Sequence, residues 1–145
     1  MTDWFTPEQR SRNMASIRSR GNKTTELRLV RLLRRAHVTG WRRRQNLPGW
    51  PDFTFRAQRM GIFVDGCFWH GCPRCYRLPE DNRSYWMEKV QTNRRRDRRN
   101  TRTLRLRGWR VLRIWEHLLI SESGLRGVTA RVKRAVGRTA SRHQF

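Results

Sequence analysis

The chain has 145 residues, a length that suits one domain built around a single hydrophobic core. Its 34 lysines and arginines against 11 acidic residues give a formal net charge of +23, a self-repulsion that a polyanionic partner would offset. No apolar run approaches the roughly 20 residues of a membrane span and the first residues do not resemble a signal peptide, so we expect a cytoplasmic nucleic-acid-binding protein without a membrane partner.

Two helices are predicted at the start of the chain. The first covers residues 7–20, after the favourable N-cap Thr6 and before the helix breaker Gly21, and it places Met14 and Ile17 on one face. A second helix is predicted from residue 24 or 25, with an apolar stripe formed by Leu29, Leu32, Leu33 and Ala36.

Strands are predicted to follow these helices. Residues 41–47 suit an edge strand, and the turn at 48–51 leads into two apolar runs, 52–56 and 60–65, that are expected to form a hairpin. The segment 66–76 is predicted to be irregular.

The rest of the chain is predicted to alternate helix and strand. The elements are a long helix over 84–106, a buried strand over 109–115 with Trp109 and Trp115 in the core, a helix over 122–136, and a basic polar tail over 137–145. The order predicts one α/β domain over residues 1–136, with a mixed central sheet flanked by helices.

All three cysteines lie within nine residues, at Cys67, Cys72 and Cys75. Their odd number argues against a disulfide framework, whereas the C-x₂-C spacing is typical of zinc sites, which need a fourth ligand. His117 is the preferred fourth ligand because it follows the strand that ends at Trp115. We therefore predict a structural Zn²⁺ site; the alternative is three reduced, buried cysteines and a surface histidine.

Four further residues suggest a second, catalytic metal site. Asp52 opens one strand of the predicted hairpin and Asp65 closes the other, so both lie toward the same end of the sheet. Glu26 could join them, and His70 is near in sequence. Carboxylates that bind Mg²⁺ beside a histidine base suit phosphodiester cleavage, although a zinc-stabilised DNA-binding module without activity remains the alternative.

A series of short motifs runs through the chain. They are Ser11-Arg-Asn-Met14, Leu47-Pro-Gly-Trp-Pro-Asp-Phe53, Phe63-Val-Asp-Gly-Cys-Phe-Trp-His70, Tyr85-Trp86, Asn93 with Arg96-Asp-Arg-Arg99, and Gly108-Trp-Arg-Val-Leu112 with Trp115-Glu116. In order and spacing, from residue 5 to residue 136, this series resembles the very short patch repair (Vsr) endonucleases.

The resemblance implies a restriction-endonuclease-like fold. It also implies nicking on the 5′ side of the thymine in T·G mismatches that arise from deamination of 5-methylcytosine. By matched position, Asp52 and the carbonyl of Val64 would bind Mg²⁺, and His70 would be the general base with Glu26 in support. The implied partners are a T·G duplex, mismatch-repair proteins and a repair polymerase, and the protein is expected to act as a monomer.

The resemblance also implies residues that contact DNA. The rings of Phe68, Trp69 and Trp86 would wedge into the base stack beside the mismatch, unless they are core aromatics. The helix with Met14 and Ile17 would lie in the other groove as a DNA-binding arm. The remaining candidates are Asn93, Arg96, Arg99 and, beside Asp52, the run Arg42-Arg43-Arg44; the cations of residues 94–99 could equally form a solvated helix face, with Asp97 orienting a guanidinium.

The sequence departs from the best-known family members at three places. Val64-Asp65 replaces Thr-His, so Asp65 would either bind metal directly or orient water. Cys72 replaces a histidine in a loop that is one residue longer, and His117 replaces a cysteine; each zinc-site change keeps a legitimate ligand. A rival within the enzymes is a restriction-type nuclease that cuts paired DNA.

Overall fold

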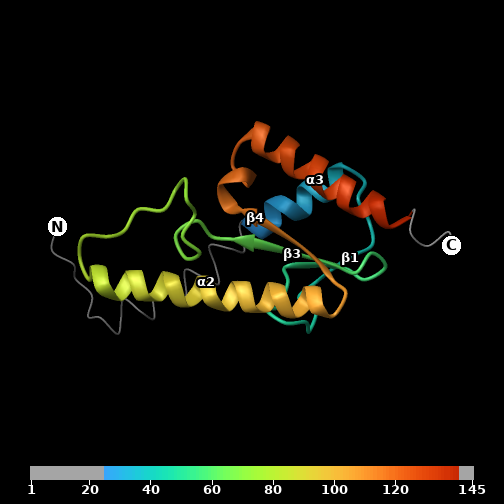
Figure 1. Ribbon diagram of the computed structural model, residues 1–145. Coiled ribbons are helices and arrows are strands. Elements are labelled where there is room, and N and C mark those ends of the chain that lie inside the picture. Colours follow the sequence, from blue (N-terminus) through green and yellow to red (C-terminus); the bar gives the residue numbers. More distant parts are fainter. Residues whose placement is uncertain (1–24, 141–145) are drawn as a thin grey trace.

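A four-stranded sheet lies between helices in the computed structural model, which describes residues 25–140 (Figure 1). A helix over residues 25–35 comes first. The later elements are β1 (Trp41–Arg43), β2 (Phe53–Phe55), β3 (Met60–Asp65), α2 (Arg83–Leu106), β4 (Arg110–Trp115), the 3-10 helix η1 (Glu116–Leu119) and α3 (Glu122–Ala140).

The sheet is mixed, as predicted. Its strand order is β1-β2-β3-β4, with antiparallel pairing among the first three strands and parallel pairing between β3 and β4. Phe53 faces Ile62 across the hairpin, so the start of β2 and the end of β3 lie at the same end of the sheet. Because β3 and β4 are parallel, their carboxyl ends also meet there, with Asp65 opposite Trp115.

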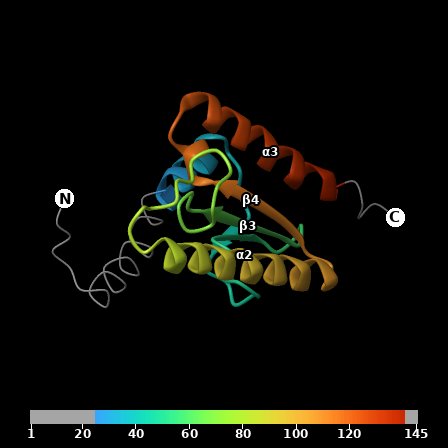
Figure 2. The same cartoon turned by 60° about the vertical axis from the view of Figure 1, so that its left-hand side comes forward.

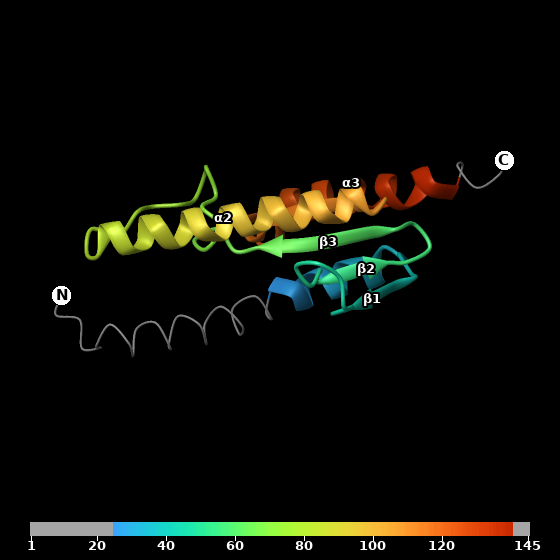
Figure 3. The ribbon, with the colours of Figure 1, turned by 60° about the horizontal axis from the view of Figure 1, so that its bottom comes forward.

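Different helices pack on the two faces of the sheet. Helix 25–35 and α3 pack on one face, and α2 covers the other (Figures 1 and 2). Alternate residues of β3 turn to the first face and join a core that contains Leu29, Leu33, Phe53, Phe55, Met60, Ile62, Val64, Ile114, Val128 and Val132. Figure 3 shows α2 running alongside β3. The intervening residues of β3, which include Phe63 and Asp65, therefore face α2.

The predicted elements agree with the structure to within a few residues, with two corrections. Trp109 and Trp115 are half-buried and not core residues, because β4 is an edge strand whose only fully buried side chain is Ile114. Helix α3 continues past Gly137 to Ala140, where a polar tail was predicted. The predicted helix 7–20, with Met14 and Ile17, lies outside the described residues. No described helix is both long and apolar enough to cross a bilayer.

Candidate active site and metal centre

Three of the predicted catalytic side chains line one cavity. Asp52 enters it from the start of β2, Asp65 from the end of β3, and His70 from the loop that follows β3. The cavity has a volume of about 490 Å³ and is completed by Gly49, Trp50, Phe63, Val64, Arg96, Asp97, Asn100 and Arg113. The hairpin thus brings together two acids that are 13 positions apart in sequence.

Asp52 is half-buried in this cavity. The backbone N–H of Val64 donates a 2.7 Å hydrogen bond to its Oδ2 atom. Burial, reinforced by the neighbouring carboxyl of Glu26, raises the pKa of Asp52 to about 8, although the Val64 N–H acts in the opposite direction. Two acids that share a desolvated site in this way provide hard oxygen ligands for a divalent cation.

Glu26 lies beside Asp52. It is buried at the start of the helix over 25–35, where it forms an ion pair with Arg43 of β1 and contacts the Asp52 carboxyl. Its described partners are therefore these two residues, whereas its predicted role was to support His70. The Arg43 side chain is therefore paired with Glu26, whereas Arg42 and Arg44 on either side of it are exposed.

Asp65 is held by an arginine of the adjacent strand. Arg113 Nη1 lies 2.8 Å from Asp65 Oδ1 and 3.1 Å from Asp65 Oδ2. Burial raises the pKa of Asp65, and the charges of His70 and Arg113 offset part of that rise. Both carboxylate oxygens are therefore engaged at the wall of the cavity.

His70 is paired with an acid that sequence reasoning assigned elsewhere. Its Nδ1 atom is hydrogen-bonded to Asp97 of α2, and it lies 3.8 Å from Asp65 Oδ1. Burial alone would raise the pKa of Asp97, but the hydrogen bond and charge of His70 hold it below its usual range. Since Nδ1 is occupied, Nε2 is the atom of His70 left for exchange of a proton.

Asp97 was expected to orient a guanidinium. Arg96 does lie nearby, with its Nη2 atom 3.9 Å from Asp97 Oδ1, but the shorter contact is to His70. One feature of the sequence could have singled out Asp97 as a site residue: it is the one acidic residue within the cationic run 94–99. Arg96 itself is half-buried and lines the cavity, whereas Arg99 is exposed on α2.

Arg113 also fixes α2 against the sheet. Its Nε atom donates to Thr101 Oγ1 at 3.1 Å and its Nη2 atom to the Asp97 carbonyl at 3.3 Å. The guanidinium carbon lies 4.2 Å from the centre of the Phe63 ring, a cation–π contact. These contacts set the position of Asp97 relative to Asp65.

The loop that carries His70 is tied to α2 at several points. Asn93 Nδ2 donates to the Trp69 carbonyl at 2.9 Å, and Arg94 donates to the carbonyls of His70 and Gly71. Gly71 has φ +63°, and a Cβ atom there would lie 2.8 Å from Val90 Cγ1, so only glycine permits this approach. Asn93 is 2% exposed. Its amide is used inside the protein to hold the loop, whereas a contact of Asn93 with DNA stays a prediction.

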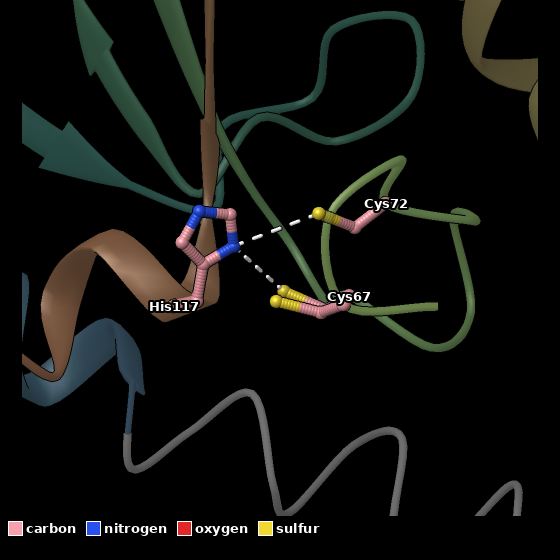
Figure 4. A group of neighbouring side chains, drawn as sticks. Cys67, Cys72 and His117 are labelled. Carbon is pink, nitrogen blue, oxygen red and sulfur yellow. Dashed lines mark hydrogen bonds between the residues drawn. The ribbon is translucent and has the colours of Figure 1, made fainter. Parts of the chain in front are cut away.

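The predicted fourth ligand joins the three cysteines. Each residue of the set Cys67, Cys72, Cys75 and His117 offers a ligand atom, and all four atoms lie within 4.8 Å of one another. His117 Nδ1 is 3.2 Å from Cys67 Sγ and 3.6 Å from Cys72 Sγ (Figure 4). Cysteine and histidine in this number and spacing can hold a metal ion.

Neighbouring groups shape this metal centre. Burial raises the pKa of Cys67 to about 12. Burial acts in the same sense on Cys72, but hydrogen bonds from the backbone N–H groups of Cys75 and Arg74 outweigh it and lower the pKa of Cys72. The carboxylate of Glu116 accepts a 2.9 Å hydrogen bond from the N–H of Cys67 and so fixes the start of the cysteine loop to η1.

The three predicted wedge residues form one aromatic cluster. The Phe68 ring lies 5.3 Å from the Trp69 ring and 5.4 Å from the Trp86 ring, and Trp69 and Trp86 are 5.9 Å apart. Phe68 and Trp69 are half-buried. Trp86 is only 4% exposed, so in this arrangement it supports the other two rings, while its neighbour Tyr85 is 46% exposed.

Comparison with known proteins places these features in a family. The sequence pattern of the family described as DNA mismatch endonuclease Vsr matches residues 2–77. A type II nicking enzyme of Xanthomonas oryzae, V.XorIIP, is 40% identical over 121 residues, which cover 80% of this chain and 85% of the relative. The DNA mismatch endonuclease Vsr of Escherichia coli is 39% identical over 118 residues (80% and 74%). The nicking enzyme V.NmeDIP of Neisseria meningitidis is 39% identical over 126 residues (83% and 82%).

Proposed function

The chain belongs to the Vsr family of DNA endonucleases, and we propose that it nicks one strand of duplex DNA on the 5′ side of the thymine in a T·G mismatch. The observation that carries the proposal is the single cavity lined by Asp52, Asp65 and His70, with Asp97 bonded to the imidazole. These groups suit hydrolysis of a phosphodiester bond. The similarity of the chain to a mismatch endonuclease and to nicking enzymes supports a mismatched duplex as the substrate and a single-strand cut as the product.

Asp52 and Val64 would hold the catalytic Mg²⁺. The fit rests on the donor set: a half-buried carboxylate beside a second acid, Glu26, whose repulsion a divalent cation would relieve. When bound, Mg²⁺ supplies positive charge that stabilises the pentacoordinate phosphate. The Val64 carbonyl is assigned by its match to the family motif, and the N–H of the same residue already fixes Asp52.

His70 would act as the general base. Asp97 holds the proton on Nδ1, so Nε2 carries the lone pair that takes a proton from the attacking water. The water oxygen then bonds to phosphorus as the bond to the leaving oxygen breaks. We assign Asp65 to orienting this water and not to binding metal, because Arg113 holds both of its oxygens.

A structural Zn²⁺ would occupy the cysteine and histidine centre. With Zn–S near 2.3 Å and Zn–N near 2.0 Å, a tetrahedral site separates sulfur from nitrogen by roughly 3.5 Å. The Nδ1–Sγ distances of 3.2 and 3.6 Å are close to that value. By closing the loop between Cys67 and Cys75, the centre would brace the segment that carries His70 and the half-buried rings.

Mismatch recognition is assigned to Phe68 and Trp69, with Trp86 packed behind them. A mismatched base step costs less free energy to unstack than a paired one, so an aromatic ring inserts more readily at the mismatch. The two rings are adjacent to His70 in sequence, which would couple recognition of the step to cleavage beside it. One active site suffices for one nick, and we propose that the protein acts as a monomer.

Cleavage of matched duplexes tests the proposal. A labelled duplex with one T·G pair is expected to be nicked 5′ of the thymine when Mg²⁺ is present and not in EDTA, and the T·A version is expected to stay intact. The Asp52→Ala variant is expected to bind the T·G duplex without cutting it. Equal cleavage of the T·G and T·A duplexes would refute mismatch selectivity, and activity retained by Asp52→Ala would refute the assigned site.

A further inference from the structure

A second cavity opens beside the catalytic one. It has a volume of about 690 Å³ and is lined by residues of the C-terminal half of α2 and of β4. It shares four of its lining residues with the catalytic cavity: Asp65, His70, Asp97 and Arg113. Nine further residues line it, and six of these form what we call the basic groove: Arg98, Arg102, Arg105, Leu106, Pro73 and Trp115.

The groove contains three guanidinium groups for which the described residues provide no anionic partner. Arg113 is paired with Asp65, and Arg94 donates to the carbonyls of His70 and Gly71. Within the part of the chain that the structure describes, by contrast, no hydrogen bond or ion pair involves the side chains of Arg98, Arg102 or Arg105. These three cations are exposed and available to an anion.

Their spacing along α2 is that of one helix face. Positions 98, 102 and 105 are separated by four and three residues, so the side chains are neighbours, and like charges at this spacing destabilise an isolated helix. An anion in the groove would offset that repulsion. From residue 98 to residue 105 the helix rises by about 10 Å, which is close to the axial length of three nucleotides at about 3.4 Å each.

The apolar part of the groove suits a nucleic acid better than a small anion. Leu106 is 78% exposed, and with Pro73 and the half-buried Trp115 it provides surface for sugars and bases between the arginines. A row of cations that begins where a phosphodiester is cleaved also matches a polymer that continues past the scissile bond.

We propose that the basic groove binds the sugar–phosphate backbone of the substrate, at about three phosphates to one side of the scissile phosphate. The inference rests on the proposed function, because the polymer in the groove is the DNA that the catalytic cavity cuts. Arg98, Arg102 and Arg105 are assigned to binding the duplex and have no part in the chemical step.

The test compares two triple variants of equal charge. One is Arg98→Gln/Arg102→Gln/Arg105→Gln in the groove. The control is Arg126→Gln/Lys133→Gln/Arg134→Gln, three exposed residues of α3 on the opposite face of the sheet (Figure 2). In an Asp52→Asn background, which prevents cutting, the affinity for a T·G duplex is measured over a series of KCl concentrations.

The groove variant is expected to reduce the slope of log K against log salt by about 2.7, or 0.9 for each lost phosphate contact, and the control by less than 1. With Asp52 restored, the groove variant is expected to need a higher DNA concentration than the control for half-maximal single-turnover nicking. Neutral methylphosphonate linkages placed one at a time beside the cut are expected to weaken binding of the unsubstituted protein at about three positions and to have no effect there on the groove variant.

Two outcomes would overturn the proposal. Salt slopes that are the same for the groove variant and the control would show that the groove does not contact the backbone. Unchanged DNA binding together with lost binding of an acidic peptide would assign the groove to a protein partner. Neither result would affect nicking of the T·G duplex by the unsubstituted chain, so failure of this inference is distinguishable from failure of the proposed function.

Discussion

The Asp52→Asn substitution is expected to inactivate the protein and, in the absence of divalent metal, to stabilise it. Burial raises the pKa of Asp52 from 3.8 to about 8. The folded state therefore holds a proton that the unfolded chain releases at neutral pH, and stability is lost as the pH rises through the window between these two values. At pH 7 the loss amounts to about 4 kcal/mol.

An asparagine removes this cost and keeps the local hydrogen bonds. Its Oδ1 atom can accept the Val64 N–H, and its Nδ2 group can donate to Glu26, as the protonated acid does. In EDTA at pH 7 the variant is thus expected to gain about 2–4 kcal/mol, which corresponds to a rise in Tm of about 5–10 °C for a chain of this size.

The assay is thermal unfolding of both proteins in EDTA and in Mg²⁺, at several pH values. Mg²⁺ is expected to stabilise only the unsubstituted protein, because ligand binding to the folded state adds stability. The exposed Asp81→Asn is the control and is expected to change Tm in neither buffer. A lower Tm for Asp52→Asn in EDTA, or equal stabilisation of both proteins by Mg²⁺, would refute the reasoning.

Three further substitutions address the other parts of the site. Asp97→Asn is expected to lower single-turnover nicking about 100-fold with little change in Tm, because the neutral amide no longer stabilises the positive charge that His70 acquires when it takes up a proton; an unchanged rate would remove Asp97 from the mechanism. His117→Ala is expected to reduce the zinc content, measured by elemental analysis, from one equivalent to much less and to lower Tm, and an undiminished content would contradict the ligand set. Arg113→Leu is expected to destabilise the protein by about 3 kcal/mol in urea unfolding, since it leaves Asp65 buried without its closest cationic partner; Arg113→Leu/Asp65→Leu should recover part of the loss, and no recovery would place the effect elsewhere.

Local patterns in the sequence predicted the parts of the fold and site that depend on a few neighbouring residues. The hairpin over 52–65 follows from two apolar runs with a short connection, and it places Asp52 and Asp65 at the same end of the sheet. His117 could be chosen as a ligand because it follows the strand that was expected to end beside the cysteine loop. Both inferences required only the directions of neighbouring strands and the positions where the chain reverses.

The features that sequence reasoning missed depend on how α2 is rotated against the sheet. Asp97 and Asn93 are one helical turn apart on the same face, and that face lies over His70 and the Trp69 carbonyl. The sequence gives the helical periodicity, but most of α2 is polar, so no apolar stripe reveals which polar side chains are turned inward. Trp86 was assigned as a wedge by its match to the family motif, with a core aromatic as the alternative, and the structure packs it, nearly buried, against Phe68 and Trp69.

The parallel pairing of β3 and β4 links the two candidate metal sites. It sets the carboxyl ends of both strands side by side, so Asp65 and the cysteine loop leave the sheet next to Glu116 and His117. The loop is thus fixed at its base by β4 and along its length by α2, and His70 lies between these two attachments. A metal at the cysteine centre would consequently hold His70 in place without taking part in the reaction. Loss of that metal should affect the rate through the position of His70, while Asp52, which is fixed by the hairpin, stays where it is.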